Sequence, residues 1–199
     1  MLSLEQLTSP LLPTVSFTAK PGQCICISGE SGSGKTLLLR AIADLDPSSG
    51  SVTLNGDLRE SLSADLWRRR VTYLPAESQW WSADVKDHFT ANDTEFTKLG
   101  FPKEVGNWQV ARLSSGERQR LALLRALDHT PQVLLLDEIT ANLDEENTLR
   151  VEQLIADRIK QGLIVIWVSH DKQQRQRIAT KSYLIRDGEF MQEDANGTG

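Results

Sequence analysis

The chain has 199 residues, which fits one domain at the usual size of roughly 150 residues. Its hydrophobic fraction of 39% and charged fraction of 25% are those of a globular protein, so the composition excludes disorder over most of the chain. A net charge of −5 disfavours non-specific attraction to nucleic acid or anionic lipid. The longest apolar run, residues 163–168, is far shorter than the roughly 18 residues that span a bilayer, and no signal segment follows Met1. We therefore expect a protein that is neither secreted nor membrane-spanning.

Cys24 and Cys26 are the two cysteines, and they alternate within a strand-like run. Side chains two apart on a strand point the same way but do not easily reach each other in disulfide geometry. We therefore expect a reduced protein in the cytoplasm.

Apolar runs and turn signals predict alternating strands and helices. We expect strands at 23–28, 51–54, 71–74, 133–136, 163–168 and 183–185, and helices at 35–43, at 113–127 and from residue 145 onward. Asn55-Gly56 is a tight-turn signal and indicates a small antiparallel β edge beside the 51–54 strand. The alternation as a whole favours an α/β fold, in which helices cover a mostly parallel sheet.

Residues 78–110 are polar, contain scattered aromatics and lack strand-like runs, which indicates a small, mostly helical lobe. We expect residues 1–199 to form a single domain. Its core lobe would comprise 1–75 and 126–191, its short helical subdomain 76–125, and its frayed polar tail 192–199.

A glycine-rich segment joins the 23–28 strand to the 35–43 helix and fits the pattern G-x-x-x-x-G-K-[ST]. Its residues are Gly29, Glu30, Ser31, Gly32, Ser33, Gly34, Lys35 and Thr36. Glycines let successive backbone N–H groups turn toward phosphates, and the helix N-terminus adds its dipole. Lys35 would reach the β- and γ-phosphates, and Thr36 would be a ligand of Mg²⁺. An ordinary Gly-Ser turn is the alternative, which the position between a strand and a helix disfavours.

Asp137 and Glu138 follow the apolar 133–136 strand. Ligands of an open parallel sheet bind at the carboxyl ends of its strands. We expect Asp137 to hold Mg²⁺ and Glu138 to act on the attacking water. A solvated strand end is the alternative for this pair, and the phosphate loop in the same chain disfavours it.

The segment 113–120 reads Leu-Ser-Ser-Gly-Glu-Arg-Gln-Arg and closely resembles the signature sequence of ABC-type ATPases. Ala-Asn-Leu-Asp at 141–144 resembles the family's loop after the acidic strand, and Ser169-His170 resembles its switch histidine. The motifs also follow one another in family order. The resemblance implies the P-loop NTPase fold and the binding of ATP and Mg²⁺.

In that family two chains pair head to tail with two ATP molecules between them. The resemblance implies that the signature segment contacts ATP held by the second chain, through Ser114, Ser115, Gly116 and Glu117, with Asp144 in the neighbouring loop. It also implies that His170 contacts the γ-phosphate. The expected catalytic residues are Glu138, His170 and Lys35.

The resemblance further implies an ATP-hydrolysing subunit that powers transport through a separate membrane permease. The protein would then lie peripherally on the cytoplasmic face of the inner membrane. The runs VLLLDEITANLDEEN and IWVSHDK resemble more narrowly the bacterial ATPases of the iron-export type. Transport substrate, direction and permease identity reside in the other subunit.

Two features depart from the family pattern. Ala76 follows Pro75 where the family usually has a glutamine that touches Mg²⁺ and the attacking water. Glu77 or Gln79 substitutes for it through a shifted loop, or coupling to the partner is weakened, or the loop works through its backbone. Residues 1–14 also contain no aromatic side chain to stack on adenine, which leaves strict ATP preference open.

Trp80 and Trp81 lie in the region that receives a short cytoplasmic helix of the transmembrane subunit in this family. Tryptophans are enriched in interface anchors. Packing inside the helical lobe is the alternative, since adjacent side chains seldom face the same way. We expect residues 67–70 to form a solvated face rather than a nucleic-acid site, and His88 and His129 to lie at the surface.

Four other functions compete with transport. An ABC-type ATPase of DNA repair carries a long coiled coil before the signature, and one of translation carries two ATPase modules, and neither fits this chain. A small-molecule kinase would explain the phosphate loop but neither the signature nor His170. A degenerate nucleotide-binding module is suggested by Ala76 and the missing aromatic side chain, whereas Lys35, Glu138 and His170 speak against it.

Overall fold

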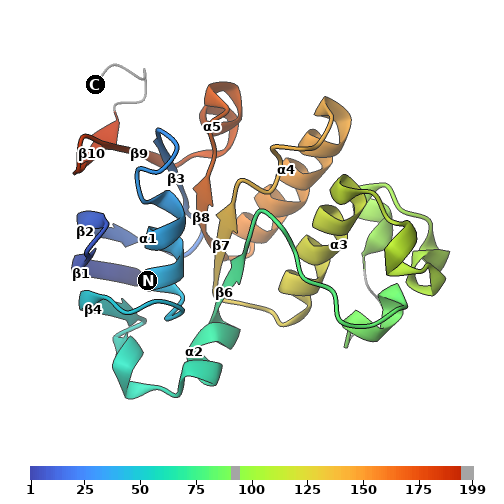
Figure 1. Ribbon diagram of the computed structural model, residues 1–199, viewed down its shortest axis with the longest axis horizontal. Coiled ribbons are helices and arrows are strands. Elements are labelled where there is room, and N and C mark those ends of the chain that lie inside the picture. The colour runs from blue at the N-terminus through green and yellow to red at the C-terminus, as the bar shows by residue number, and fades with distance from the viewer. Residues whose placement is uncertain (91–94, 194–199) are drawn as a thin grey trace.

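The computed structural model describes residues 1–90 and 95–193, and the strands of this part form two sheets (Figure 1). The larger sheet has the strand order β10-β9-β3-β8-β7-β6. Its strands are β3 (Cys24–Gly29), β6 (Val71–Leu74), β7 (Val133–Asp137), β8 (Ile164–Val168), β9 (Lys181–Arg186) and β10 (Glu189–Glu193). All neighbours pair in parallel except β10, which pairs antiparallel with β9. The mostly parallel sheet is therefore confirmed.

The smaller sheet is antiparallel, with the order β2-β1-β4-β5. Its strands are β1 (Leu2–Ser9), β2 (Leu12–Ala19), β4 (Ser49–Leu54) and β5 (Asp57–Leu58). Asn55 and Gly56 join β4 to β5 with φ of 55° and 92°, the left-handed conformation that a type I′ turn requires. This sheet is the antiparallel edge that the sequence predicts.

Helix α1 (Lys35–Ile42) packs between the two sheets. Its residues Leu38, Leu39 and Ile42 are fully buried in one core cluster with side chains of both sheets. Helix α2 (Ala64–Arg70) closes one end of this core, because the buried indole of Trp67 donates from Nε1 to the carbonyl of Ile42 at 2.9 Å. The expectation of a solvated face is thus wrong for Trp67.

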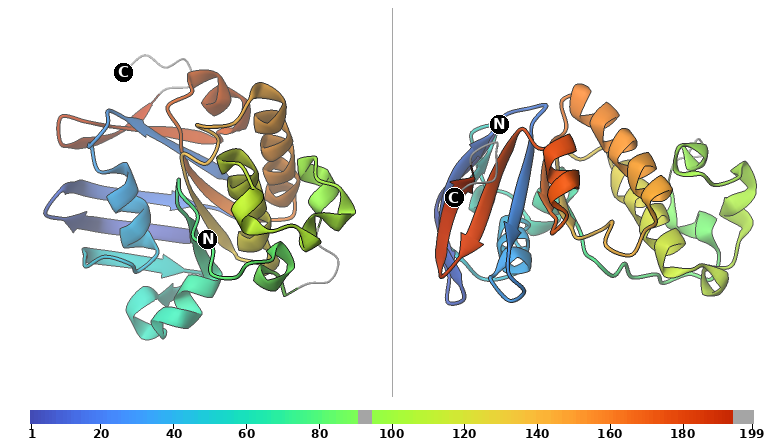
Figure 2. Two further views of the ribbon diagram at one scale, coloured as in Figure 1. Left: turned by 45° about the vertical axis from the view of Figure 1, so that its right-hand side comes forward. Right: turned by 90° about the horizontal axis from the view of Figure 1, so that it is seen from above.

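The other face of the larger sheet is covered by α3 (Ser115–Asp128) and α4 (Glu145–Lys160), as Figures 1 and 2 show. Side chains alternate along β7, so that Leu135 lies in the first core cluster while Leu134 and Leu136 lie in the second, with α3 and α4. Helix α5 (Lys172–Ile178) follows β8.

Between β6 and α3 the described residues form short 3₁₀ helices rather than α-helices. They are Val85–His88, Phe96–Leu99, Lys103–Asn107 and Val110–Arg112. Gly100 (φ 78°) and Pro102 interrupt helical continuity there. The expectation that His88 lies at the surface is wrong, because the rings of Trp80 and Trp81 pack on it with centroids 4.6 and 4.5 Å away. The division of the chain into a core lobe and a helical subdomain stays a prediction.

The frayed tail predicted for 192–199 is wrong for its first two residues. Gln192 and Glu193 belong to β10 and pair with residues of β9. Phe190 anchors this strand by stacking on Tyr183, with ring centroids 4.6 Å apart. Residues 194–199 lie outside the described part.

None of the helices in the described part of the chain has the length and apolar character needed to cross a bilayer.

Candidate functional site

Three sequence motifs meet at one edge of the larger sheet. The phosphate loop follows β3, the acidic pair follows β7, and Ser169-His170 follows β8. These strands are adjacent and parallel, with Ile27 and Asp137 both in register with Val168. Their carboxyl ends therefore coincide, which is where open α/β sheets bind ligands.

The phosphate loop adopts a backbone that its glycines make possible. Gly29, Gly32 and Gly34 have φ of 148°, 80° and 100°. A Cβ atom on Gly29 would lie 2.4 Å from the carbonyl oxygen of Ile185 and 2.7 Å from Oγ of Ser33, so a larger residue does not fit. Oγ of Ser33 is buried and has no hydrogen-bond partner within the described residues. An unpaired polar atom in a glycine-lined loop at the start of α1 fits a bound phosphate group.

Lys35 bonds to the backbone of this loop. Its ammonium Nζ donates to the carbonyl oxygens of Gly29 and Glu30, at 2.9 and 2.8 Å, and the side chain is buried. Burial lowers the pKa of Lys35, and the nearby carboxylates of Glu138 and Asp137 act in the opposite direction. The ammonium group of Lys35 thus lies against the loop backbone and near the carboxylates of Glu138 and Asp137.

Thr36 and Asp137 are joined directly, although 101 positions separate them. Oγ1 of Thr36 donates to Oδ2 of Asp137 at 2.8 Å. Asp137 is buried at the end of β7, while Thr36 is exposed in the first turn of α1. A hydroxyl beside a carboxylate supplies the oxygen donors that Mg²⁺ prefers.

Glu138 and His170 form the second pair. Oε1 of Glu138 lies 2.8 Å from Nε2 of His170. Glu138 has a left-handed φ of 51°, and its backbone N–H donates to the carbonyl of Val168 at 3.1 Å. A non-glycine residue in this region stores strain, a feature common at functional sites.

The signature segment begins α3 with a capping box. Oγ of Ser114 accepts from the backbone N–H of Glu117 at 3.2 Å, and the Glu117 carboxylate accepts from the backbone N–H of Ser114 at 2.8 Å. Ser114 and Ser115 are exposed. A Cβ on Gly116 would lie 3.0 Å from Leu143, so the segment touches the loop at 141–144.

Asp144 caps the next helix: its carboxylate accepts from the backbone N–H of Asn147 at 2.8 Å. This bond lowers the pKa of Asp144. In Figure 1, α1 with its phosphate loop and α3 lie on opposite sides of β6, β7 and β8. The signature segment therefore does not face the phosphate loop of its own chain.

Comparison with known proteins identifies the family. The family model described as ABC transporter matches residues 12–141, more than half of the chain. The chain belongs to the ABC transporter family. It is 32% identical over 179 residues to the "Probable iron export ATP-binding protein FetA" of Escherichia coli (strain K12), covering 82% of this chain and 80% of that protein. It is 35% identical over 188 residues to the aliphatic sulfonates import ATP-binding protein SsuB of Albidiferax ferrireducens, covering 89% of this chain and 66% of that protein.

A solved structure shares the fold. It is the dimeric structure of a post-hydrolysis state of the ATP-binding cassette MJ0796 bound to ADP and Pi, which matches with a TM-score of 0.82 at 23% identity and covers 100% of both chains. The P-loop NTPase fold is thereby confirmed, and the chain is an ABC-type ATPase.

The loop after β6 contains Ala76, at the position where the sequence resemblance leads us to expect a glutamine. The carbonyl of Pro75 accepts a bond of 2.7 Å from Nε2 of Gln119 on α3. A cavity of about 550 Å³ opens beside it, and Ala76, Glu77, Gln79 and Glu138 are among its lining residues. Both candidate stand-ins for the family glutamine therefore share one cavity with Glu138.

The two tryptophans differ in exposure. Trp80 packs against the second core cluster, whereas Trp81 is 69% exposed. The guanidinium of Arg125 on α3 lies 4.6 and 4.7 Å from the two ring centroids and donates to the carbonyl of Gln79 at 2.9 Å. One tryptophan thus anchors the loop and the other presents its ring to the outside.

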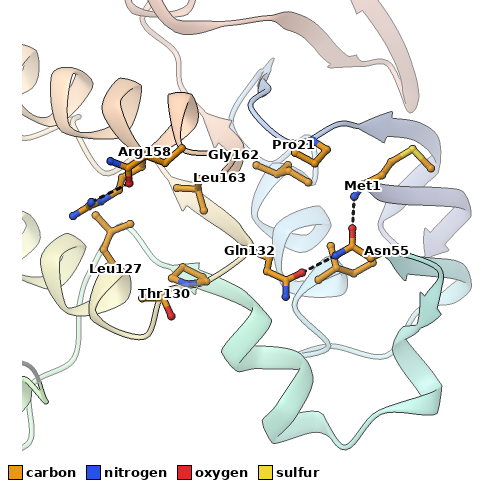
Figure 3. A pocket seen from close by; sticks show the side chains of 13 residues that line it. Met1, Pro21, Asn55, Leu127, Thr130, Gln132, Arg158, Gly162 and Leu163 are labelled. Atoms are coloured by element: carbon orange, nitrogen blue, oxygen red, sulfur yellow. Dashed lines mark hydrogen bonds between the residues drawn. The ribbon is translucent and has the colours of Figure 1, made fainter.

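A separate hollow of about 470 Å³ lies at the amino ends of β7 and β8, away from the phosphate loop (Figure 3). Its polar groups bond to one another: the Met1 amine donates to Oδ1 of Asn55, whose Nδ2 donates to Gln132 at 2.8 Å. Its lining residues, all in the described part of the chain, include no carboxylate. The carboxylates of Asp137 and Glu138 lie instead at the opposite edge of the sheet, where β7 ends.

Proposed function

We propose that this ABC-type ATPase powers transport through a separate membrane permease, to which it binds on the cytoplasmic face of the inner membrane. Two chains would pair head to tail with two MgATP molecules between them. The observation that carries the proposal is the meeting of the phosphate loop, Asp137 and the Glu138–His170 pair at one sheet edge.

The phosphate loop would bind the ATP phosphates through its backbone N–H groups, with Lys35 reaching the β- and γ-phosphates. To do so, Nζ of Lys35 exchanges its bonds to the Gly29 and Glu30 carbonyls for bonds to phosphate oxygens. Thr36 and Asp137 would hold Mg²⁺. When bound, the ion would neutralise charge on the phosphate oxygens.

Glu138 would orient the attacking water, a contribution of roughly 10²- to 10⁴-fold to the rate. His170 lies within hydrogen-bond distance of the Glu138 carboxylate and would support the charge that develops on the γ-phosphate. Both side chains remain partly exposed, at 33% and 51%, so access from solvent is open in a single chain. Closure of the dimer would exclude bulk water from this pair.

The signature segment supports the head-to-tail arrangement. Ser114 and Ser115 are exposed at the start of α3, where backbone N–H groups and the helix dipole favour an anion. Because α3 and α1 lie on opposite sides of the sheet strands, the ATP that this segment contacts would be held by a second copy.

Trp80 and Trp81 are the proposed contacts with the permease. The support is the exposed ring of Trp81, held in place by Arg125 and His88. Export of a metal, iron in particular, is the narrower proposal, and it rests on the similarity to FetA. The chain is about as similar to a sulfonate importer, so sequence identity does not distinguish export from import. We propose that the permease determines direction and substrate.

Light scattering of Glu138→Gln with and without MgATP tests the proposal. Blocked hydrolysis traps the nucleotide sandwich, so we expect a dimer that forms only with MgATP and is lost when Lys35→Ala is added. A monomer with demonstrated ATP binding would contradict self-closure and favour a degenerate nucleotide-binding module.

A further inference from the structure

Tyr73 reaches the acidic end of β7 although it belongs to none of the sequence motifs. Its phenol donates to Oδ2 of Asp137 at 2.9 Å. The same oxygen accepts the hydroxyl of Thr36 at 2.8 Å. Two donors from two different elements, β6 and α1, therefore converge on one carboxylate oxygen.

The pairing of β6 with β7 explains the reach. Tyr73 is in register with Leu135, two residues before Asp137, so both side chains stand on the same face of the sheet. A diagonal neighbour on an adjacent strand lies within reach of an aromatic side chain. The Tyr73 ring packs against the first core cluster, which restricts its movement.

A carboxylate that accepts two bonds on one oxygen is fixed in its plane. A tyrosine hydroxyl, with an ordinary pKa near 10, is a donor at neutral pH. Tyr73 and Thr36 both donate to Oδ2, which restricts rotation of the Asp137 carboxylate and leaves Oδ1 without a bond from either of them. Partners of this kind set the orientation of metal-binding carboxylates.

We propose that Tyr73 is a positioning residue for the Mg²⁺ site, holding Asp137 in the orientation that receives the metal with ATP. The inference rests on the proposed function, in which Thr36 and Asp137 bind that ion. Tyr73 itself touches neither metal nor nucleotide.

Tyr73→Phe removes one oxygen atom and keeps the packed ring. The readout is the fluorescence of a labelled ATP analogue titrated with Mg²⁺, on the full chain, beside a titration of the analogue in EDTA. Loss of such a partner costs roughly 10- to 100-fold in metal affinity. We expect Tyr73→Phe to raise the half-saturating Mg²⁺ concentration by about tenfold or more and to leave analogue binding in EDTA unchanged.

Tyr183→Phe is the matched control. The chain has two tyrosines, and this one lies in β9, packed against Phe17 and stacked on Phe190. The Mg²⁺ titration of Tyr183→Phe should match that of the original protein. The melting temperatures of the two variants should agree with each other, which shows that both are folded. A Tyr73→Phe titration equal to that of the original protein would overturn the inference, as would equal weakening with and without metal. If the original protein binds the analogue without any dependence on Mg²⁺, the proposed metal site itself fails, and the inference falls with it.

Discussion

Oε1 of Glu138 lies 2.8 Å from Nε2 of His170, across the ends of two neighbouring strands. The contact depends on the backbone, because the N–H of Glu138 donates to Val168, two residues before the histidine. The backbone of Glu138 has a left-handed φ of 51°. Strand pairing therefore places the backbones of the two residues close together.

His170→Ala should lower the turnover of ATP by about 10²-fold or more, because it removes the group that supports charge on the γ-phosphate. ATP binding should change little, since Lys35 and the phosphate loop remain. Phosphate release and equilibrium binding measure the two effects. The exposed His129 supplies the control, and turnover of His170→Ala within threefold of His129→Ala would contradict the assigned role.

Two replacements of Ser114 should distinguish its role as the N-cap of α3 from its proposed contact with phosphate. Ser114→Ala loses the cap of α3 and should cost about 1 kcal/mol of unfolding free energy in urea, whereas Ser114→Asn keeps a capping side chain and most of that stability. Both should weaken the MgATP-dependent dimer in the Glu138→Gln background. A dimer that persists fully with Ser114→Asn would show that the hydroxyl acts only as a cap.

Glu152 on α4 is buried, and Arg177 on α5 donates to both of its carboxylate oxygens, at 2.8 and 2.7 Å. Arg177→Met leaves that charge in the core with one remaining bond, from Gln174 at 3.1 Å. We expect a loss of about 2–3 kcal/mol in urea, below the full cost of breaking a buried pair because Arg177 is 41% exposed.

The matched control is Arg69→Met, whose ion pair with Asp65 is 71% and 79% exposed and should contribute less than about 0.5 kcal/mol. Equal effects of the two arginine variants would contradict the buried-charge explanation.

Ala76→Gln should fit without strain, since Ala76 is exposed and lines the cavity that it shares with Glu138. One added hydrogen bond near the attacking water corresponds to about a two- to tenfold gain in turnover. Ala76→Met adds similar volume without the amide and should give no gain. If Ala76→Gln and Ala76→Met have the same effect on turnover, another residue already performs the role of the expected glutamine. Loss of turnover in Glu77→Ala or Gln79→Ala would then identify that residue.

Sequence alone predicts most of the sheet and the convergence of its motifs. The predicted strand 71–74 matches β6, because the residue before a proline favours an extended conformation and a short run that ends at a proline is typical of a strand. Parallel strands then bring Asp137 and His170 to one edge. The family and the fold follow from the signature segment.

What sequence misses depends on long-range pairing. Tyr73 reads as a core residue until its register with β7 is known. Helix α5 has seven residues and is mostly polar, so its buried Gln174 gives no periodic signal. The sequence does not predict the β9–β10 hairpin, although Asp187-Gly188 is a turn signal, because β10 carries few apolar residues to mark a strand.

The two bonds from α3 to the loop after β6 have a consequence for how this protein can change over generations. Gln119 and Arg125 bond to the backbone carbonyls of Pro75 and Gln79, not to their side chains. Every residue type offers that carbonyl, so these two bonds do not depend on which side chains the loop carries, whereas the packing of Arg125 on Trp80 and Trp81 does. A substitution such as the alanine at position 76 is therefore tolerated structurally. The bonds from Gln119 and Arg125 would therefore remain if the side chains of the loop changed to suit a different partner.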